Sequence, residues 1–216
     1  MASLFQNLIR AVKGSSAGIV PATGTGAGTP GIVSSLSPTM QYPEGSEVAT
    51  IAAGCFWGVE HIYRKYFGDG KGLIDCRVGY CGGVSKNPTY REVCSSGTGH
   101  AEALQIVFDP KIVTYETLID FFFRIHDPTT TNRQGPDVGT QYRSAIFYHS
   151  DDQKLIATEV KDRLQKTYYP DSPIVTQILK IDTFWDAETY HQLYLHKNPF
   201  GYECPTHFLR TTPATA

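Results

Sequence analysis

Strand-like and helix-like patterns alternate along the chain from Glu47 onward, and this alternation constrains the fold more than any other feature of the sequence. The expected strands span residues 47–53, 73–80, 101–109, 143–150 and 174–182, and the expected helices span residues 59–66, 114–126 and 151–167. In the first two helical segments apolar residues recur at the i, i+3, i+4 spacing of one helix face. Ser150 followed by Gln153 has the capping-box pattern that opens the third helix. The alternation predicts one layered domain in which helices cover a mixed sheet.

The first 45 residues differ in composition from the rest of the chain. They are rich in Gly, Pro, Ser and Thr, and such a segment buries too little apolar surface to fold by itself. Arg10 and Lys13 are basic and no acidic residue precedes Glu44, a pattern compatible with a mitochondrial presequence. We therefore expect residues 1–45 to form a disordered or targeting extension. A cytoplasmic location is the main expectation, and a mitochondrial one is the alternative.

The overall composition excludes several classes of protein. A chain of 216 residues with 41% hydrophobic residues can bury one sizeable core. The net charge of -2 offers no basic surface for nucleic acid. No stretch approaches the roughly 18 consecutive apolar residues of a membrane-spanning helix. We expect a monomer that binds neither nucleic acid nor a membrane.

The five cysteines are too irregularly placed for a stable disulfide framework. They lie at positions 55, 76, 81, 94 and 204, an odd number without a CxxC spacing. Seven scattered histidines add no metal-ligand pattern, so we expect neither a metal nor another cofactor. The cysteine usage indicates a reducing compartment, where a disulfide would be transient and catalytic.

Cys55 lies in the sequence GCFWG, between an expected strand end and an expected helix start. The first turn of a helix presents free N–H groups and the positive end of its dipole, which favours a thiolate. This effect is worth at most about 2 kcal/mol, or little more than one pKa unit. A second group, or the substrate, must therefore help to activate Cys55.

Glu102 is the natural second group. It shares the face of an expected strand with Leu104, Ile106 and Phe108, because residues two apart point the same way. Burial without a cationic partner raises the pKa of a carboxyl group, and a neutral carboxylic acid donates a hydrogen bond. Without further information, a solvent-facing glutamate at a strand end remains the alternative.

Several longer motifs resemble the peptide methionine sulfoxide reductase A family. They are GCFWG, VGYCGG, NPTYREVCSSGTGHAE, FFFRIHDPTT, GPDVGTQYRSAIFYHS and YHQLYLHKNP, which extend from about Val48 to Arg210. The resemblance implies that residues 46–216 form a catalytic reductase domain. With the alternation of elements, it leads us to expect an α+β fold. This would be a two-layer α/β sandwich with a mixed sheet, a ferredoxin-like core and a long coil C-terminal segment.

The resemblance also implies a role for each motif residue. Cys55 would be the nucleophile that attacks the sulfoxide sulfur and becomes a sulfenic acid. Glu102 would bind and protonate the sulfoxide oxygen, since that oxygen leaves poorly until it is protonated. The implied substrate-binding residues are Phe56 and Trp57 around the methyl group, Tyr90 and Tyr142 as hydrogen-bond donors, and Asp137 as the residue that orders this network or a water.

Turnover in this family requires a resolving cysteine. Cys204 is the only cysteine in the tail, from about residue 197, which we expect to be mobile. The resemblance is to the fungal type with one resolving cysteine, so it implies a Cys55–Cys204 disulfide that thioredoxin reduces. Cys81 departs from the family's usual small apolar residue and remains a rival resolving thiol. Cys76 and Cys94 are expected to be buried structural thiols.

The predicted function is therefore reduction of the S-epimer of methionine sulfoxide, free or in oxidised proteins, as repair of oxidative damage. Two other classes fit the residues without the resemblance. One is a cysteine hydrolase with a histidine base, and the other is a redox-sensing or peptide-binding module without catalysis. The client proteins, and the preference for free or protein-bound substrate, do not follow from the sequence.

Overall fold

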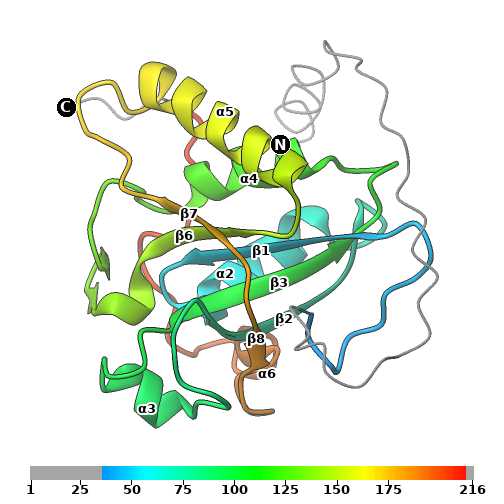
Figure 1. Ribbon diagram of the computed structural model, residues 1–216, viewed down its shortest axis with the longest axis vertical. Helices are drawn as coiled ribbons and strands as arrows, with labels where there is room; N and C mark the ends of the chain where they lie inside the picture. The colour runs from blue at the N-terminus through cyan, green and yellow to red at the C-terminus, as the bar shows by residue number, and fades with distance from the viewer. Residues whose placement is uncertain (1–35, 213–216) are drawn as a thin grey trace. The chain divides into compact units, whose positions relative to one another are not determined.

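The computed structural model describes residues 36–212, whose centre is a six-stranded sheet with the order β7-β6-β1-β3-β2-β8 (Figure 1). Its strands are β1 (Glu47–Ala53), β2 (Leu73–Cys81), β3 (Ala101–Phe108), β6 (Ser144–Tyr148), β7 (Gln177–Lys180) and β8 (Phe184–Asp186). A separate pair joins β4 (Arg133–Gln134) to β5 (Asp137–Val138). In the large sheet β6 and β7 pair in parallel, and the other neighbours are antiparallel. The predicted α+β fold with a mixed sheet is confirmed.

Helices connect the strands. They are α2 (Phe56–Phe67), α3 (Tyr90–Cys94), α4 (Tyr115–Ile125), α5 (Asp151–Thr167), α6 (Tyr194–Lys197) and the 3-10 helix η1 (Thr140–Tyr142). β1 and α5 have the bounds predicted from the sequence. The sequence did not reveal α3, β4, β5, β8 and α6, because elements of two to five residues show no period.

The start of α5 shows how the local sequence sets an element boundary. The Ser150 side chain accepts a hydrogen bond from the backbone N–H of Gln153, as the capping pattern predicts. The Gln153 side chain, however, accepts from the N–H of His149 rather than from that of Ser150, at 3.0 Å. Only half of the capping box is therefore formed.

The four central strands follow the chain order β1, α2, β2, β3, α4, β6, with the short α3 between β2 and β3. Their spatial order is β6-β1-β3-β2. This is the β-α-β-β-α-β connectivity of a ferredoxin-like unit. β7 and β8, which come late in the chain, extend this unit by one strand at each edge.

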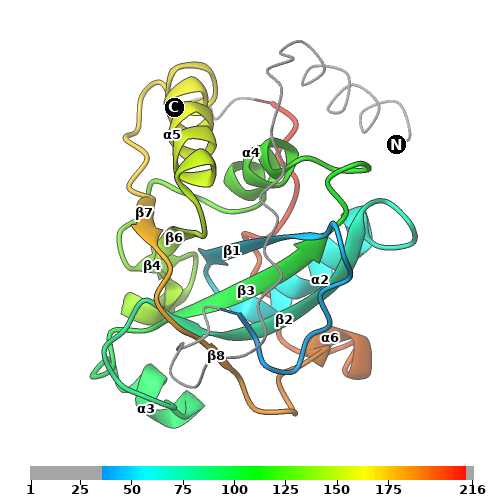
Figure 2. The same ribbon diagram turned by 45° about the vertical axis from the view of Figure 1, so that its right-hand side comes forward.

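The two faces of the sheet are covered by different parts of the chain. On one face α2 packs on β1, β2 and β3. The helix α4 contacts β1 and α5, and α5 also packs on β6 and β7. On the face opposite α2, the chain between β7 and β8 crosses the sheet, as both ribbon views show (Figure 2). A buried hydrophobic cluster lies where this segment crosses the sheet. It consists of Ala52, Cys81, Ala101, Ala103, Ala145, Phe147, Ile181 and Phe184.

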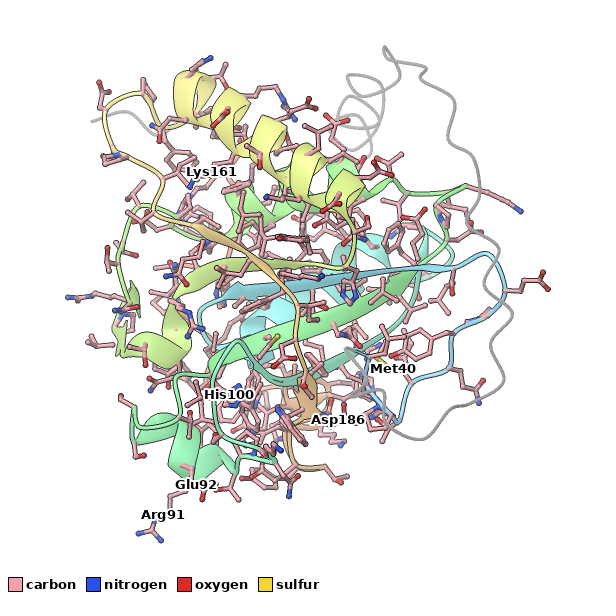
Figure 3. The ribbon with its side chains drawn as sticks, viewed as in Figure 1. Met40, Arg91, Glu92, His100, Lys161 and Asp186 are labelled. Carbon is pink, nitrogen blue, oxygen red and sulfur yellow. The ribbon has the colours of Figure 1, made fainter. Side chains whose placement is uncertain are left out.

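Residues 36–45, which the composition assigned to the extension, pack against the sheet. The N–H of Ser37 donates to Gln105 Oε1 at 2.7 Å, and the Tyr42 hydroxyl donates to the same oxygen at 3.1 Å. Met40 is buried and lies toward the same edge of the sheet as Asp186 (Figure 3). The extension predicted for residues 1–35 lies outside the described residues.

After α6 the chain has no helix or strand through residue 212, as expected for a long coil segment. This tail is docked in the structure. Cys204 and His207 are buried, and the N–H of Arg210 donates to the carbonyl of Arg124 in α4 at 3.0 Å. In the described part of the chain, no helix is long and apolar enough to cross a bilayer.

Candidate active site

Cys55 occupies the turn between β1 and α2. Gly54 has φ +94°, a left-handed backbone angle that favours glycine, and it directs the chain from the strand into the helix. Cys55 follows as the N-cap residue of α2. It is a free thiol with 6% of its surface exposed. The predicted strand-to-helix position is confirmed.

The electrostatic setting of Cys55 differs from the expectation of a simple helix end. Burial raises the pKa of the thiol well above its ordinary value, and the Glu102 carboxylate raises it further. The N–H groups of Trp57 and Gly58 lower the pKa, but less strongly. The helix terminus therefore lowers the pKa of the Cys55 thiol, as predicted, but burial raises this pKa by more.

Glu102 faces α2 and touches the residue next to Cys55. Its Oε2 accepts a hydrogen bond from the backbone N–H of Phe56 at 3.0 Å. The residue is 1% exposed, and burial raises its pKa to about 8 although the Phe56 N–H opposes that shift. Glu102 is therefore mostly protonated at neutral pH, and its neutral form no longer opposes a thiolate on Cys55. The solvent-facing alternative is wrong.

Tyr90 and Tyr142 lie around the same carboxyl group. Burial raises the pKa of both hydroxyls, and the charge of Glu102 is the next cause in each case. Cys55 also contributes to the raised pKa of Tyr142. Both phenols therefore stay protonated and can donate hydrogen bonds.

Asp137 faces the C-terminal tail as well as the nucleophile. Its Oδ1 accepts a hydrogen bond from the Tyr202 hydroxyl at 2.8 Å, and its charge helps to raise the pKa of both Cys55 and Cys204. Its buried Oδ2 has no hydrogen-bond partner among the described residues. The contact with Tyr202 was not foreseen, because β5 is only two residues long and left no sequence signal.

The Cys204 thiol contacts two polar groups, one in β4 and one in the tail itself. Its Sγ donates to the carbonyl of Gln134 at 3.5 Å and lies 3.3 Å from Thr206 Oγ1. The residue is 1% exposed, and burial raises the pKa of its thiol. Docked in this way, the Cys204 sulfur is closed to a second protein.

The two aromatic residues after Cys55 have unequal surroundings. Phe56 is 1% exposed, with its ring centroid 5.1 Å from that of His191. Trp57 is partly exposed, stacks on Tyr194 at 3.7 Å and donates its Nε1–H to His191 Nδ1 at 3.0 Å. Trp57 is thus the more accessible of the two rings.

Sequence reasoning missed His191 and Glu188. His191 is 1% exposed and contacts the rings of Phe56, Trp57 and Tyr90. Glu188 accepts from the Tyr90 backbone N–H at 2.9 Å and from the Tyr80 hydroxyl at 2.7 Å. The motif YHQLYLHKNP contains His191, but one motif match assigns no role to its members.

The other three cysteines differ in how deeply they are buried. Cys76 is fully buried, as predicted. Cys81 is also fully buried, in the cluster on the sheet face opposite α2. The prediction for Cys94 is wrong. It ends the short surface helix α3, is only half-buried, and hydrogen-bonds the Tyr90 side chain.

A cavity of about 180 Å³ lies beside this site but does not include Cys55 or Glu102. It is lined by Trp57, Glu60, His61, Arg64, Lys65, Leu193, Leu195 and His196. No cysteine lines this cavity. Among the described residues, no group of three or more His, Cys, Asp or Glu side chains is arranged to hold a metal ion.

The chain is similar to known proteins over most of its length. Residues 47–214 match the family described as peptide methionine sulfoxide reductase. The probable peptide methionine sulfoxide reductase of Schizosaccharomyces pombe is 54% identical over 164 residues, which are 76% of this chain and 96% of that protein. The peptide methionine sulfoxide reductase of Saccharomyces cerevisiae is 49% identical over 182 residues, covering 81% and 97%.

Solved structures of Mxr1 from Saccharomyces cerevisiae are similar to this chain. The reduced form has a TM-score of 0.77 at 49% identity, covering 82% of this chain and 99% of that one. An unusual oxidised form has a TM-score of 0.59 at 47% identity, covering 82% and 96%. This chain therefore belongs to the peptide methionine sulfoxide reductase family and is an enzyme of the MsrA type.

Proposed function

We propose that this enzyme reduces the S-epimer of methionine sulfoxide, with Cys55 as nucleophile and Glu102 as acid. The observation that carries the proposal is the hydrogen bond from the Phe56 N–H to Glu102 Oε2 at 3.0 Å. This hydrogen bond holds the buried carboxyl group of Glu102 against Phe56, the residue directly after Cys55. Because the pKa of this group is about 8, it carries a proton at neutral pH.

In the first step the Cys55 sulfur attacks the sulfoxide sulfur. Glu102, assisted by Tyr90 and Tyr142, donates a hydrogen bond and then a proton to the sulfoxide oxygen. The sulfur–oxygen bond of the substrate breaks as a bond between the two sulfurs forms, and the oxygen leaves as water with the proton from Glu102 and the Cys55 thiol proton. A water then attacks the Cys55 sulfur, the bond between the two sulfurs breaks, the thioether is released, and one proton returns to Glu102. Cys55 is left as a sulfenic acid, so its sulfur loses two electrons and the substrate sulfur gains them.

In the second step the Cys204 thiol attacks the Cys55 sulfenic acid. A sulfur–sulfur bond forms, the Cys55 sulfur–oxygen bond breaks, and water leaves with the thiol proton. Thioredoxin then reduces the Cys55–Cys204 disulfide. A relative supports this partner, because Mxr1 has been crystallised in complex with Trx2, and that structure has a TM-score of 0.58 to this chain. Oxidised proteins and free methionine sulfoxide are the proposed substrates, in repair of oxidative damage.

The competing classes make different demands on Cys55. A cysteine hydrolase needs a histidine nitrogen bonded to the nucleophile, and no described residue provides that hydrogen bond to Cys55. A binding module needs neither a buried protonated carboxyl group nor a tail cysteine.

The decisive test supplies the S- and R-epimers of methionine sulfoxide separately, with a dithiol as reductant. We expect methionine from the S-epimer only. The Cys55→Ser variant should form none, because a serine hydroxyl is a weak nucleophile at neutral pH. Equal reduction of both epimers would contradict the stereochemical assignment. Activity in the Cys55→Ser variant would contradict the assignment of the nucleophile.

A further inference from the structure

The tail is anchored next to Cys55 by a histidine that the proposed chemistry does not use. His207 Nε2 lies 2.7 Å from the carbonyl oxygen of Ala53, the residue before the Gly54–Cys55 turn. The side chain is buried, and burial lowers its pKa, so the imidazole is neutral. A carbonyl oxygen only accepts, which fixes the proton on Nε2 and makes it the donor.

The imidazole lies where two glycines leave room for it. A Cβ at Gly58 would overlap His207 Nδ1 and would lie 3.2 Å from its Cγ. A Cβ at Gly54 would lie 3.3 Å from His207 Nε2 and 2.7 Å from Gln134 Cβ. Gly58 is in the first turn of α2 and has no positive φ, so the backbone does not require glycine there. Alanine forms helices better than glycine, and the contact with His207 is what excludes it.

His207 is tied to Cys204 through a tight turn. The N–H of His207 donates to the carbonyl of Cys204 at 3.0 Å, which closes a four-residue turn whose ends lie within about 7 Å. Gln134 links the same groups from the other side, since its carbonyl accepts from Cys204 Sγ and its side chain touches Gly54. The contacts of His207 with Ala53 and Gly58 therefore hold Cys204 close to the Gly54–Cys55 turn.

We infer that His207 is a positioning residue whose imidazole, seated against Gly58, holds Cys204 ready to attack the Cys55 sulfenic acid. The inference rests on the proposed disulfide step. Docking favours that step by raising the effective concentration of the Cys204 thiol. Docking opposes the following step, the reduction of the disulfide by thioredoxin, because the docked Cys204 is 1% exposed and thioredoxin must reach its sulfur.

Rapid-quench analysis of one turnover without reductant tests this inference in the His207→Ala variant. Release of the first equivalent of methionine should keep its wild-type rate, because the hydrogen bonds of His207 go to the backbone of Ala53 and Cys204 and not to Cys55 or Glu102. Disulfide formation should slow by about tenfold or more, the effect of losing one buried hydrogen-bonded contact. A dimedone-type probe should trap the accumulating sulfenic acid. His61→Ala, an exposed histidine of α2, is the matched control and should form the disulfide at the wild-type rate.

Gly58 provides the second arm of the test. Gly58→Ala should slow disulfide formation in the wild-type background, because the new methyl group displaces the imidazole. In the His207→Ala background it should have no further effect, since the two changes remove the same contact.

Wild-type disulfide formation in His207→Ala would overturn the inference, as would equal slowing by Gly58→Ala in both backgrounds. Absence of the Cys55–Cys204 disulfide in the wild type would instead overturn the proposed function. Thermal unfolding of each variant confirms that it is folded.

Discussion

Glu102 owes its chemistry to its place on β3. Every residue of that strand is buried, and a carboxyl group in such a strand loses the water that would stabilise its charge. One backbone N–H from Phe56 is too little to restore the ordinary pKa, which therefore rises to about 8. On a solvent-facing strand the same side chain would keep its ordinary pKa and would be ionised at neutral pH.

Glu102→Gln keeps a hydrogen-bond donor but removes the proton to be transferred. The single-turnover rate of methionine release should fall by about 10²–10⁴, while substrate binding changes less. In the wild type this rate should decline as the pH rises through about 8, because the protonated fraction of Glu102 disappears. Glu159→Gln, an exposed change on α5, is the control. An unchanged rate in Glu102→Gln would exclude the acid role.

At the scale of elements, the proposed disulfide step requires the C-terminal tail to change its position. In this structure the tail holds Cys204 against Gln134 of β4, and the Tyr202 hydroxyl donates a hydrogen bond to Asp137. Thioredoxin could reach the proposed disulfide only after the tail leaves this position, because the docked Cys204 is 1% exposed.

Cys204→Ser should separate two quantities that the wild type couples. One equivalent of methionine per enzyme should still form, because Cys55 and Glu102 perform that step alone. Turnover with thioredoxin should collapse, and a small dithiol should restore part of it by reaching the Cys55 sulfur directly. Cys81→Ser should cycle normally, since Cys81 is fully buried on the other sheet face. The roles would be exchanged if Cys81→Ser stalled after one equivalent and Cys204→Ser did not.

At the scale of the whole molecule, much of the architecture was visible in the sequence. The apolar run of 47–53 predicted the bounds of β1, the capping pattern at Ser150 predicted the start of α5, and the phase of Glu102 with Leu104 predicted its buried face. The site's outer contacts were not visible, because Glu188, His191 and His207 lie in irregular segments. Their positions depend on how the chain after β8 packs back onto the domain, and that part of the chain has no period in the sequence.

Buried ionisable groups should also shape global stability. The pKa of Glu102 rises from 4.5 to about 8 on folding. Its contribution to the free energy of unfolding is therefore fully present below about pH 4.5 and is lost as the pH rises through 8. His126 and His149 act oppositely, because burial lowers their pKa from 6.5 to about 3 and about 4. Their contribution is present above pH 6.5 and is lost as the pH falls.

Urea unfolding of the wild type and Glu102→Gln across pH 5 to 9 measures this balance. From pH 6.5 to 8 the unfolding free energy of the wild type should fall relative to that of Glu102→Gln, which has no carboxyl group to titrate. Parallel curves would show that Glu102 has the same pKa in the folded and unfolded chain. Below pH 6.5 the histidines should add the same decline to both proteins, and the difference caused by Glu102 should continue down to about pH 4.5.

The late position of β7 and β8 has a consequence for biosynthesis. These strands complete both edges of the large sheet, although only residues 177–186 encode them. Until that stretch leaves the ribosome, β6 and β2 present open backbone edges to other chains. At about 5–20 residues per second, the same ten residues then close both edges within about two seconds. A nascent chain interrupted before residue 177 would leave two unprotected edges at once and be a natural client for chaperones.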